Sequence, residues 1–330
     1  MYRIFIGGIN GQTPETPGSE ENFSTRLISS GFTVESSPKD AQFAICVDNN
    51  REFQKKVSES NITKNRTILI RNEPTVVCPD NKESRAISYF GLILDMGRPV
   101  SKSVNVLPWP QHWPTIPYSL SSKSNRLEKM VLVNGNKISF IPGELYSLRR
   151  KAIIRIKDLD FYGTWWGLSL KEKMRHALAN VLIAIKGGFF PRYSGANNYF
   201  RVYRNWKGAP IDKLVTMSQY KYSLVIENCS EFITEKLFDA FFAGCIPIYV
   251  GPKLDDFPIP SNLYFQTEPD LQSILESYTQ IQAIDYSVWS GELEKWLNSS
   301  EALEYWSSDQ VNKRTVSLIQ KYCDKETGLV

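Results

Sequence analysis

The chain has 330 residues, enough for about two domains at roughly 150 residues each. Apolar residues make up 42% and aromatic residues 12% of it, so it has ample material for packed cores, which argues against global disorder. Lysine and arginine number 39 against 35 acidic residues, a formal net charge of +4. This excess is too small and too scattered to predict a nucleic-acid-binding face.

Cysteine usage and the lack of targeting segments bear on location. The five cysteines form no Cys-x-x-Cys pair, so free, partly buried thiols in a reducing compartment are expected. The sequence begins MYRIFIGG, without the basic stretch and cleavage site of a signal peptide. No apolar run approaches the ~18 residues of a membrane span. We therefore expect a cytoplasmic protein, with peripheral association at the inner membrane surface left open.

In the first third of the chain, short apolar runs alternate with amphipathic segments. Strands are expected at Tyr2–Ile6, Gln42–Val47, Thr67–Arg71 and Phe90–Leu94, and helices at Glu21–Ser30 and Arg51–Glu59. This alternation predicts a mostly parallel sheet with helices on both faces. The proline-rich run Pro108–Pro114 then excludes helix and central strand. We place a domain boundary in the polar segment that follows, giving domains of residues 1–120 and 121–330.

A second α/β series follows this boundary. Strands are expected at Lys129–Val133, Tyr162–Trp166, Tyr220–Glu227 and Ile246–Val250, and helices at Glu144–Lys157, Lys171–Lys186 and Thr234–Ala243. The C-terminal segment is rich in predicted helix. The expected fold is therefore α/β, with two Rossmann-like domains facing a cleft. Ligands of such sheets bind beyond the carboxyl ends of the strands.

The segment Tyr220–Gly251 is predicted to form a complete strand–loop–helix–strand unit. Glu227 and Asn228 lie where the first strand ends, and Thr234 can cap the helix. Lys236 falls in the first helical turn, where the helix dipole disfavours a cation by about 0.3–1 kcal/mol. A phosphate group in front of the helix end would explain this lysine. The alternative is a solvated lysine whose stem covers apolar surface.

Three parts of this segment carry a family resemblance: Ile226-Glu-Asn228, Phe232-Ile-Thr-Glu-Lys236 and Ala243-Gly-Cys-Ile-Pro-Ile-Tyr-Val-Gly251. Together they resemble the C-terminal signature of the α-1,3-fucosyltransferases (glycosyltransferase family 10). The upstream run Gly208–Lys213 resembles the approach to the same strand. The resemblance implies a GT-B fold and inverting transfer of fucose from GDP-fucose to a hydroxyl of a glycan or lipid-linked oligosaccharide. It also implies an N-terminal acceptor-binding domain and a C-terminal donor-binding domain.

The resemblance assigns roles within the motif. Asn228, Glu235 and Lys236 are implied to contact GDP-fucose, with Glu235 on ribose or fucose hydroxyls and Lys236 on the diphosphate. Glu227 is implied either to hydrogen-bond the sugar or to brace the loop. Phe232 stands where the family usually has tyrosine, so a hydroxyl contact is lost there while stacking or packing remains.

An inverting transfer needs a base for the acceptor hydroxyl. Arg71-Asn-Glu-Pro74 follows a predicted strand and resembles the family's Glu-Ser-Pro element without its serine. Glu73 is therefore our candidate base, and an ordinary turn residue before proline is the alternative.

The departing diphosphate needs positive charge. The family places an arginine on the helix that follows the first strand of the second domain, where Arg149 fits best and Arg150 is the alternative. A solvated basic face is the competing interpretation. The predicted donor-binding residues are Arg149, Arg150, Glu227, Asn228, Phe232, Thr234, Glu235 and Lys236.

We predict no metal and no cofactor besides the donor substrate. Asp158-Leu-Asp160 resembles a metal–diphosphate motif of another transferase class, but it follows a predicted helix end. His112 is interpreted as acceptor-side or structural. Four tryptophans are interpreted either as sugar-stacking or as core residues: Trp109, Trp113, Trp165 and Trp166. A transferase using another nucleotide sugar and a catalytically inactive nucleotide-sugar-binding protein remain alternative functions.

Overall fold

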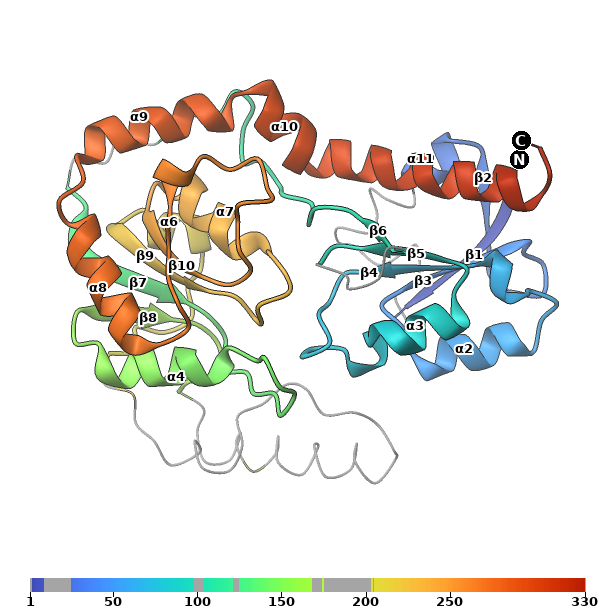
Figure 1. Cartoon of the computed structure of the whole chain (residues 1–330), viewed down its shortest axis with the longest axis horizontal. Helices are drawn as coiled ribbons and strands as arrows, with labels where there is room; N and C mark the ends of the chain where they lie inside the picture. Colours follow the sequence, from blue (N-terminus) through green and yellow to red (C-terminus); the bar gives the residue numbers. More distant parts are fainter. Residues whose placement is uncertain are drawn as a thin grey trace. The chain divides into compact units, whose positions relative to one another are not determined.

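The structure is a computed structural model that describes residues 2–8, 25–97, 104–120, 125–167, 174, 203 and 205–329. The chain forms two compact units (Figure 1). The first comprises Met1–His112 and Glu304–Val330, and the second Trp113–Leu303. Each unit is built around its own parallel sheet.

The first unit contains a six-stranded sheet in the order β2-β1-β3-β4-β5-β6, with every neighbouring pair parallel. Its strands are β1 (Tyr2–Gly8), β2 (Phe32–Glu35), β3 (Phe43–Val47), β4 (Thr67–Arg71), β5 (Leu92–Asp95) and β6 (Asn105–Val106). The four predicted strands are confirmed, whereas the short β2 and β6 were not predicted. Of the helix predicted at Glu21–Ser30, residues 25–29 are helical and residues 21–24 lie outside the described part.

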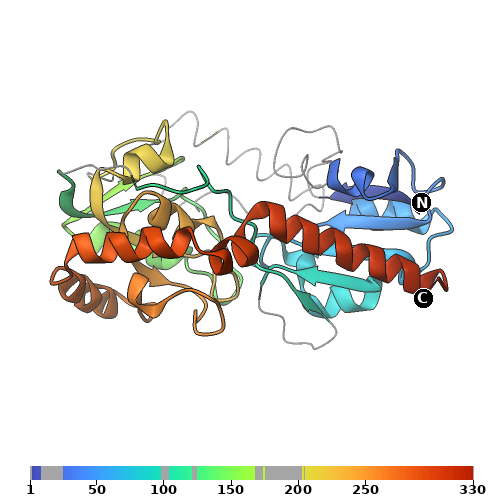
Figure 2. The same ribbon diagram turned by 90° about the horizontal axis from the view of Figure 1, so that it is seen from above.

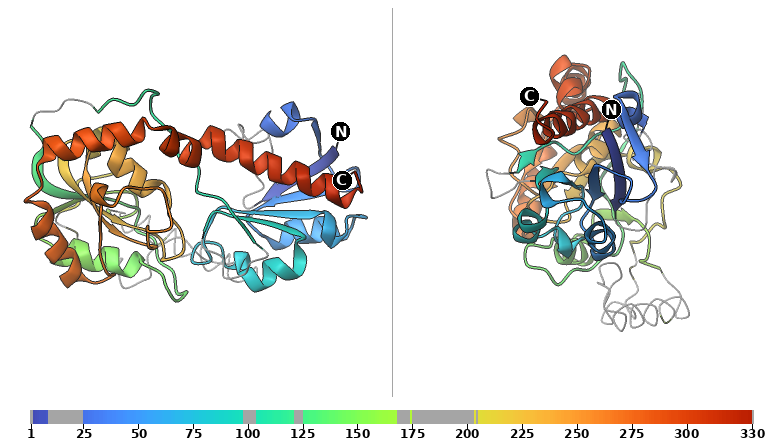
Figure 3. Two further views of the ribbon diagram at one scale, coloured as in Figure 1. Left: turned by 45° about the horizontal axis from the view of Figure 1, so that its top comes forward. Right: turned by 90° about the vertical axis from the view of Figure 1, so that its right-hand side faces the viewer.

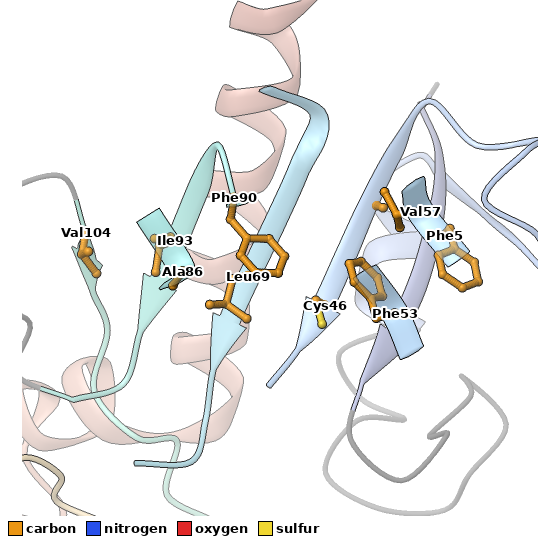
Figure 4. Close-up of a cluster of buried hydrophobic side chains, with 10 residues drawn as sticks. Phe5, Cys46, Phe53, Val57, Leu69, Ala86, Phe90, Ile93 and Val104 are labelled. Atoms are coloured by element: carbon orange, nitrogen blue, oxygen red, sulfur yellow. The ribbon is translucent and has the colours of Figure 1, made fainter. Parts of the chain in front are cut away.

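Helices cover both faces of this sheet. They are α2 (Arg51–Ser58), α3 (Glu83–Tyr89) and α11 (Ser308–Glu326), with short 3₁₀ turns η2 (Lys64–Arg66) and η3 (Pro79–Asn81). Helices α2 and α3 lie on one face and α11 on the other (Figures 2 and 3). Helix α2 begins where the side chain of Asn50 accepts a hydrogen bond from Phe53 N at 2.8 Å. Its buried Phe53 and Val57 then meet Phe5, Leu69 and other apolar side chains of the sheet (Figure 4).

The second unit contains a five-stranded parallel sheet in the order β11-β10-β9-β7-β8. Its strands are β7 (Leu127–Val133), β8 (Leu159–Tyr162), β9 (Tyr220–Ile226), β10 (Ile246–Val250) and β11 (Phe265–Gln266). Its helices are α4 (Tyr146–Arg155), α6 (Lys213–Met217), α7 (Glu235–Phe242), α8 (Leu271–Ile281), α9 (Tyr286–Leu297) and α10 (Ser300–Trp306), with the 3₁₀ turn η5 (Ser261–Leu263). Helix α10 extends into the segment that belongs to the first unit. Helices α4 and α7 lie on opposite faces of the sheet (Figure 1).

The strand predicted at Tyr162–Trp166 is wrong, because β8 ends at Tyr162. Gly163 follows with φ 145°, and Trp165 has φ 66°. An added Cβ on Gly163 would lie 1.8 Å from the carbonyl oxygen of Asn134, so the chain turns here against the loop after β7. The helix predicted at Lys171–Lys186 lies outside the described residues, apart from Met174.

The compact units differ from the domains of residues 1–120 and 121–330 that we predicted. The first break falls at His112, and α11 belongs to the first unit. Tyr2 Oη donates to Asp324 Oδ1 at 2.6 Å, and Tyr322 Oη donates to the carbonyl oxygen of Asn65 at 2.8 Å. These contacts join segments far apart in the sequence, which local patterns do not reveal. Among the described residues, we find no helix with the length and apolar character to cross a membrane.

Candidate functional site

The carboxyl end of β9 brings together most of the predicted donor-binding residues. Glu227 N donates to the carbonyl oxygen of Val250 at 2.9 Å, so the β9–β10 ladder extends one residue past the strand. A loop then leads to α7, which returns the chain to β10. Gly251 allows this arrangement, since an added Cβ there would lie 2.8 Å from Glu227 Cγ. The predicted strand–loop–helix–strand unit is therefore present.

Glu227 is fully buried and braces the start of α7. Its Oε1 accepts from Thr234 N at 2.9 Å, and its Oε2 accepts from Thr234 Oγ1 at 2.6 Å. Lys236 Nζ lies 3.5 Å from the same Oε2. Both carboxylate oxygens are thus engaged, which supports the bracing alternative for this residue over a sugar contact.

Thr234 stands at the N-cap position of α7, but its side chain makes no capping hydrogen bond. Its hydroxyl donates to Glu227 and accepts from Lys236 Nζ at 2.7 Å. The expected cap is therefore wrong, because the hydroxyl oxygen that would accept from the first amides of α7 accepts from Lys236 instead. The first amides of α7 consequently lack a capping hydrogen bond from the Thr234 side chain.

The ammonium groups of two lysines lie close to the Glu235 carboxylate at the start of α7. Lys236 Nζ also lies 3.5 Å from Glu235 Oε1, and Lys213 Nζ lies 3.8 Å from that oxygen. Burial acts to raise the pKa of the Glu235 carboxyl, but Lys236 and Lys213 outweigh it and hold that pKa at about 2. Glu235 is 48% exposed while Lys236 is 13% exposed, so Glu235 is the more accessible to a ligand. Lys213 also forms an ion pair with Asp239.

Arg149 lies beneath the same strand end and is 2% exposed. Its Nε and Nη2 donate to the carbonyl oxygen of Ile226 at 3.1 and 2.6 Å, and Nη2 also donates to Asn228 Oδ1 at 3.0 Å. Nη1 has no hydrogen-bond partner among the described residues. Burial lowers the pKa of the guanidinium, which an arginine tolerates without losing its charge. Arg149 therefore lies beside Asn228 with its Nε and Nη2 engaged in hydrogen bonds.

Arg150 faces away from this group. Its Nη1 donates to the carbonyl oxygen of Lys137 at 2.6 Å and its Nη2 to Ser147 Oγ at 3.0 Å. The geometry thus favours Arg149 over Arg150 as the predicted phosphate ligand. Phe232 is completely buried, so the packing alternative holds for its ring and a stacking surface is absent.

Glu73 belongs to the other compact unit. It follows β4 and is partly exposed. Its backbone N–H donates to Asp48 Oδ1 at 2.8 Å, and its carbonyl oxygen accepts from Asn81 Nδ2 at 2.7 Å. Sequence reasoning missed Asp48 and Asn81. The polar pair Asp48-Asn49, directly after the apolar strand β3, is the sequence feature that could have indicated the role of Asp48.

The remaining candidates have structural roles. Asp160 accepts from Tyr220 Oη at 3.1 Å and lies 3.8 Å from Lys207 Nζ, whereas Asp158 is exposed. In the part of the chain that is described, no group of three or more His, Cys, Asp and Glu residues could hold a metal ion. The prediction of metal independence stays a prediction.

Two of the tryptophans considered for sugar stacking pack in the core. Trp113 contacts the rings of Phe238 and Phe242, and Trp166 contacts Phe161. All five cysteines are unpaired and buried, which confirms the predicted free thiols. Burial raises the pKa of Cys229 to about 12, which disfavours its thiolate form.

Sequence comparisons link part of the chain to known proteins. No protein-family model matches it. A fucosyltransferase-like protein of Arabidopsis thaliana is 32% identical over 92 residues, which are 26% of this chain and 18% of that protein. The 4-galactosyl-N-acetylglucosaminide 3-alpha-L-fucosyltransferase 9 of Mus musculus is 34% identical over 74 residues, 21% of this chain and 20% of that protein. The matches thus span about a fifth of the length of these relatives.

Solved structures match over nearly the whole chain. An α1,3-fucosyltransferase crystallised with GDP-fucose aligns with a TM-score of 0.51 and 13% identity, covering 96% of this chain and 90% of that one. Sucrose-phosphate synthase from Thermosynechococcus elongatus aligns with a TM-score of 0.60 and 12% identity, covering 97% and 99%. At these identities the likeness establishes the architecture. The chain therefore has the GT-B fold, and part of it is similar in sequence to fucosyltransferases.

Proposed function

We propose that this protein is an inverting α-1,3-fucosyltransferase that moves fucose from GDP-fucose to a hydroxyl of a glycan or lipid-linked oligosaccharide. The second unit binds the donor, the first unit binds the acceptor, and no metal takes part. The observation that carries the proposal is the arrangement at the carboxyl end of β9. There, Arg149 and Asn228 adjoin the Glu227–Thr234–Lys236 network at the start of α7.

This arrangement suits a nucleoside diphosphate. The start of α7, where the Thr234 side chain makes no capping hydrogen bond, presents the positive end of the helix dipole, which favours phosphate. Lys236 adds an ammonium group in the first turn, and Nη1 of Arg149 offers a charged donor. Glu235, ionised and 48% exposed, is suited to accept hydrogen bonds from sugar hydroxyls.

In the proposed reaction, the acceptor oxygen forms a bond to C1 of fucose while the bond from C1 to the diphosphate oxygen breaks. The configuration at C1 inverts. Glu73 takes the proton from the acceptor hydroxyl, and GDP leaves with the bonding electron pair. Arg149, Lys236 and the α7 amides stabilise the charge that develops on the diphosphate.

Calorimetric titration of the purified protein with GDP, UDP, ADP and GDP-fucose in EDTA tests the donor assignment. We expect binding of GDP and GDP-fucose, and little binding of UDP or ADP. A preference for UDP would identify a transferase for another nucleotide sugar. Binding that requires Mg²⁺ would contradict metal independence.

Turnover of GDP-fucose, by transfer to an acceptor or by hydrolysis, tests catalysis. Glu73→Gln should bind GDP as the wild type does and lose turnover, since the amide cannot accept the proton. Glu83→Gln, on α3 of the same unit, is a matched control that should keep full turnover. A wild-type protein that binds GDP-fucose and never turns it over is a binding protein, and the proposal would then fail.

A further inference from the structure

We propose that Asp48 is a positioning residue for this transfer, because its buried carboxylate fixes the loop that carries Glu73. This inference rests on the proposed function, in which Glu73 is the base. It concerns the first unit alone.

Asp48 is placed next to that loop by the sheet. It directly follows β3, and its N–H donates to the carbonyl oxygen of Ile70 in the neighbouring β4 at 2.9 Å. Its side chain then turns under the chain that leaves β4. Oδ1 accepts from Asn72 N at 2.9 Å and from Glu73 N at 2.8 Å. Asp48 is only 6% exposed, so these hydrogen bonds face little competition from water.

Asn81 holds the other side of the same peptide. Its Nδ2 donates to the carbonyl oxygen of Glu73 and to Asp48 Oδ1, both at 2.7 Å, and its Oδ1 accepts from Asn49 N at 2.7 Å. Asn81 is fully buried. Both backbone polar groups of Glu73 are therefore bound within the unit, while its side chain is partly exposed.

The backbone of Asp48 is strained. Its φ is 54°, the left-handed region that costs a non-glycine residue about 1–2 kcal/mol. Aspartate is among the residues that tolerate this region best, but glycine would remove the strain altogether. We infer that the Asp48 side chain compensates for this strain through its contacts, which include hydrogen bonds from Asn72, Glu73 and Asn81.

The consequence for catalysis is geometric. A general base has to come within about 2.6–3.2 Å of the oxygen whose proton it takes. A displacement of 1 Å at a reacting group can cost about 100-fold in rate. A loop held only by Pro74 and solvent would leave Glu73 free to drift by that amount. Asp48 therefore acts through Glu73 and touches neither substrate.

The decisive variant is Asp48→Gly, which removes the carboxylate and accommodates φ 54° without strain. We expect kcat for GDP-fucose turnover to fall by about 10- to 100-fold. The KM for GDP-fucose and the Kd of GDP should stay unchanged within about twofold, because the proposed donor residues lie in the second unit. Asp48→Asn should recover most of the loss, since its amide oxygen can accept from Asn72 and Glu73.

Asn50→Ala is the matched control. It lies two residues away and removes the cap of α2, a change that costs about 0.5–2 kcal/mol of stability. Asn50 accepts from Phe53 N and donates to the carbonyl oxygen of Asp48 at 3.5 Å. Because it contacts neither the Asp48 carboxylate nor the Glu73 loop, kcat should stay at the wild-type value wherever the variant is folded.

The outcomes separate the inference from the proposed function. If Glu73→Gln loses turnover and Asp48→Gly keeps it, the positioning role is wrong and the base assignment stands. Equal losses of kcat in Asp48→Gly and Asn50→Ala would show a general stability effect, which also overturns the inference. If Glu73→Gln keeps turnover, or the wild type shows none, the proposed function fails and the inference falls with it.

Discussion

The buried carboxylate of Glu227 should contribute far more to stability than the exposed carboxylate of Glu235, although both approach the same ammonium. Each carboxylate has an oxygen 3.5 Å from Lys236 Nζ, but Glu227 is 0% exposed and Glu235 is 48% exposed. Replacing either glutamate by glutamine is the same chemical change at the same distance. The pair therefore compares a buried carboxylate held by Thr234 and Lys236 with an exposed one near Lys236 and Lys213.

The magnitude follows from the contacts. In Glu227→Gln, Oε1 can still accept from Thr234 N, but the new amide group faces Thr234 Oγ1 and Lys236 Nζ, which both donate to Oε2 in the wild type. The hydrogen bond to the charged oxygen is worth about 1.5–3 kcal/mol. Breaking one side of a buried ion pair costs about 3–5 kcal/mol. Since the two terms overlap and Lys236 can turn toward Glu235, we expect a total loss of about 3 kcal/mol.

Urea titration followed by tryptophan fluorescence measures this difference. With a slope of about 3 kcal/mol per M, Glu227→Gln should lower the midpoint by about 1 M. Glu235→Gln should lower it by no more than about a third of that, because a surface pair is worth about 0–1 kcal/mol. Equal shifts in the two variants would refute the reasoning, since burial would then have no effect on this network.

Three further predictions follow from the second unit. Arg149→Lys should weaken GDP binding by about tenfold or more, because a lysine cannot replace a two-armed charged donor. Arg150→Lys should change GDP affinity by less than about twofold, and equal losses of affinity measured by calorimetry would contradict this prediction. The Glu235 carboxyl has a folded-state pKa of about 2 against a usual 4.5. Its contribution to the free energy of unfolding is therefore complete above pH 4.5 and is lost as the pH falls toward 2. The stability difference between wild type and Glu235→Gln should vanish at that low pH. Gly163→Ala should destabilise more than Gly143→Ala: both have positive φ, but only the first would bring a Cβ within 1.8 Å of a carbonyl oxygen. Similar melting temperatures for the two alanine variants would show that the clash is relieved.

The regular parts of both sheets could be predicted from the sequence because each buried strand is a short apolar run between turn residues. Strands β3, β4, β9 and β10 are fully or almost fully buried along their length, and their boundaries were predicted to within one residue. Strand β8 could not be placed correctly. Its sequence Leu159-Asp-Phe-Tyr162 is followed, after Gly163 and Thr164, by two tryptophans that suggest a longer strand. The turn at Gly163 is set by contact with the loop after β7.

The side-chain partners at the site were less predictable. The motif located Glu227, Thr234 and Lys236, but Thr234 was expected to cap its own helix. Its hydroxyl instead donates to a carboxylate seven residues earlier. The role of Asp48 depends on a residue 25 positions later. The first contact forms within the loop between β9 and α7, and the second joins the loops that follow the neighbouring strands β3 and β4. Neither contact leaves a local sequence pattern.

The discontinuity of the first unit constrains the order in which the protein can fold during synthesis. The second unit is one continuous segment, Trp113–Leu303, whereas the first needs both Met1–His112 and Glu304–Val330. When the ribosome has translated Leu303, every residue of the second unit has been synthesised. Helix α11 has not, so the face of the first sheet that it covers is still exposed. The N-terminal sheet therefore keeps apolar surface exposed while nearly two hundred further residues are synthesised. A nascent chain stalled before α11 should be the species that chaperones retain, although its second unit is already complete.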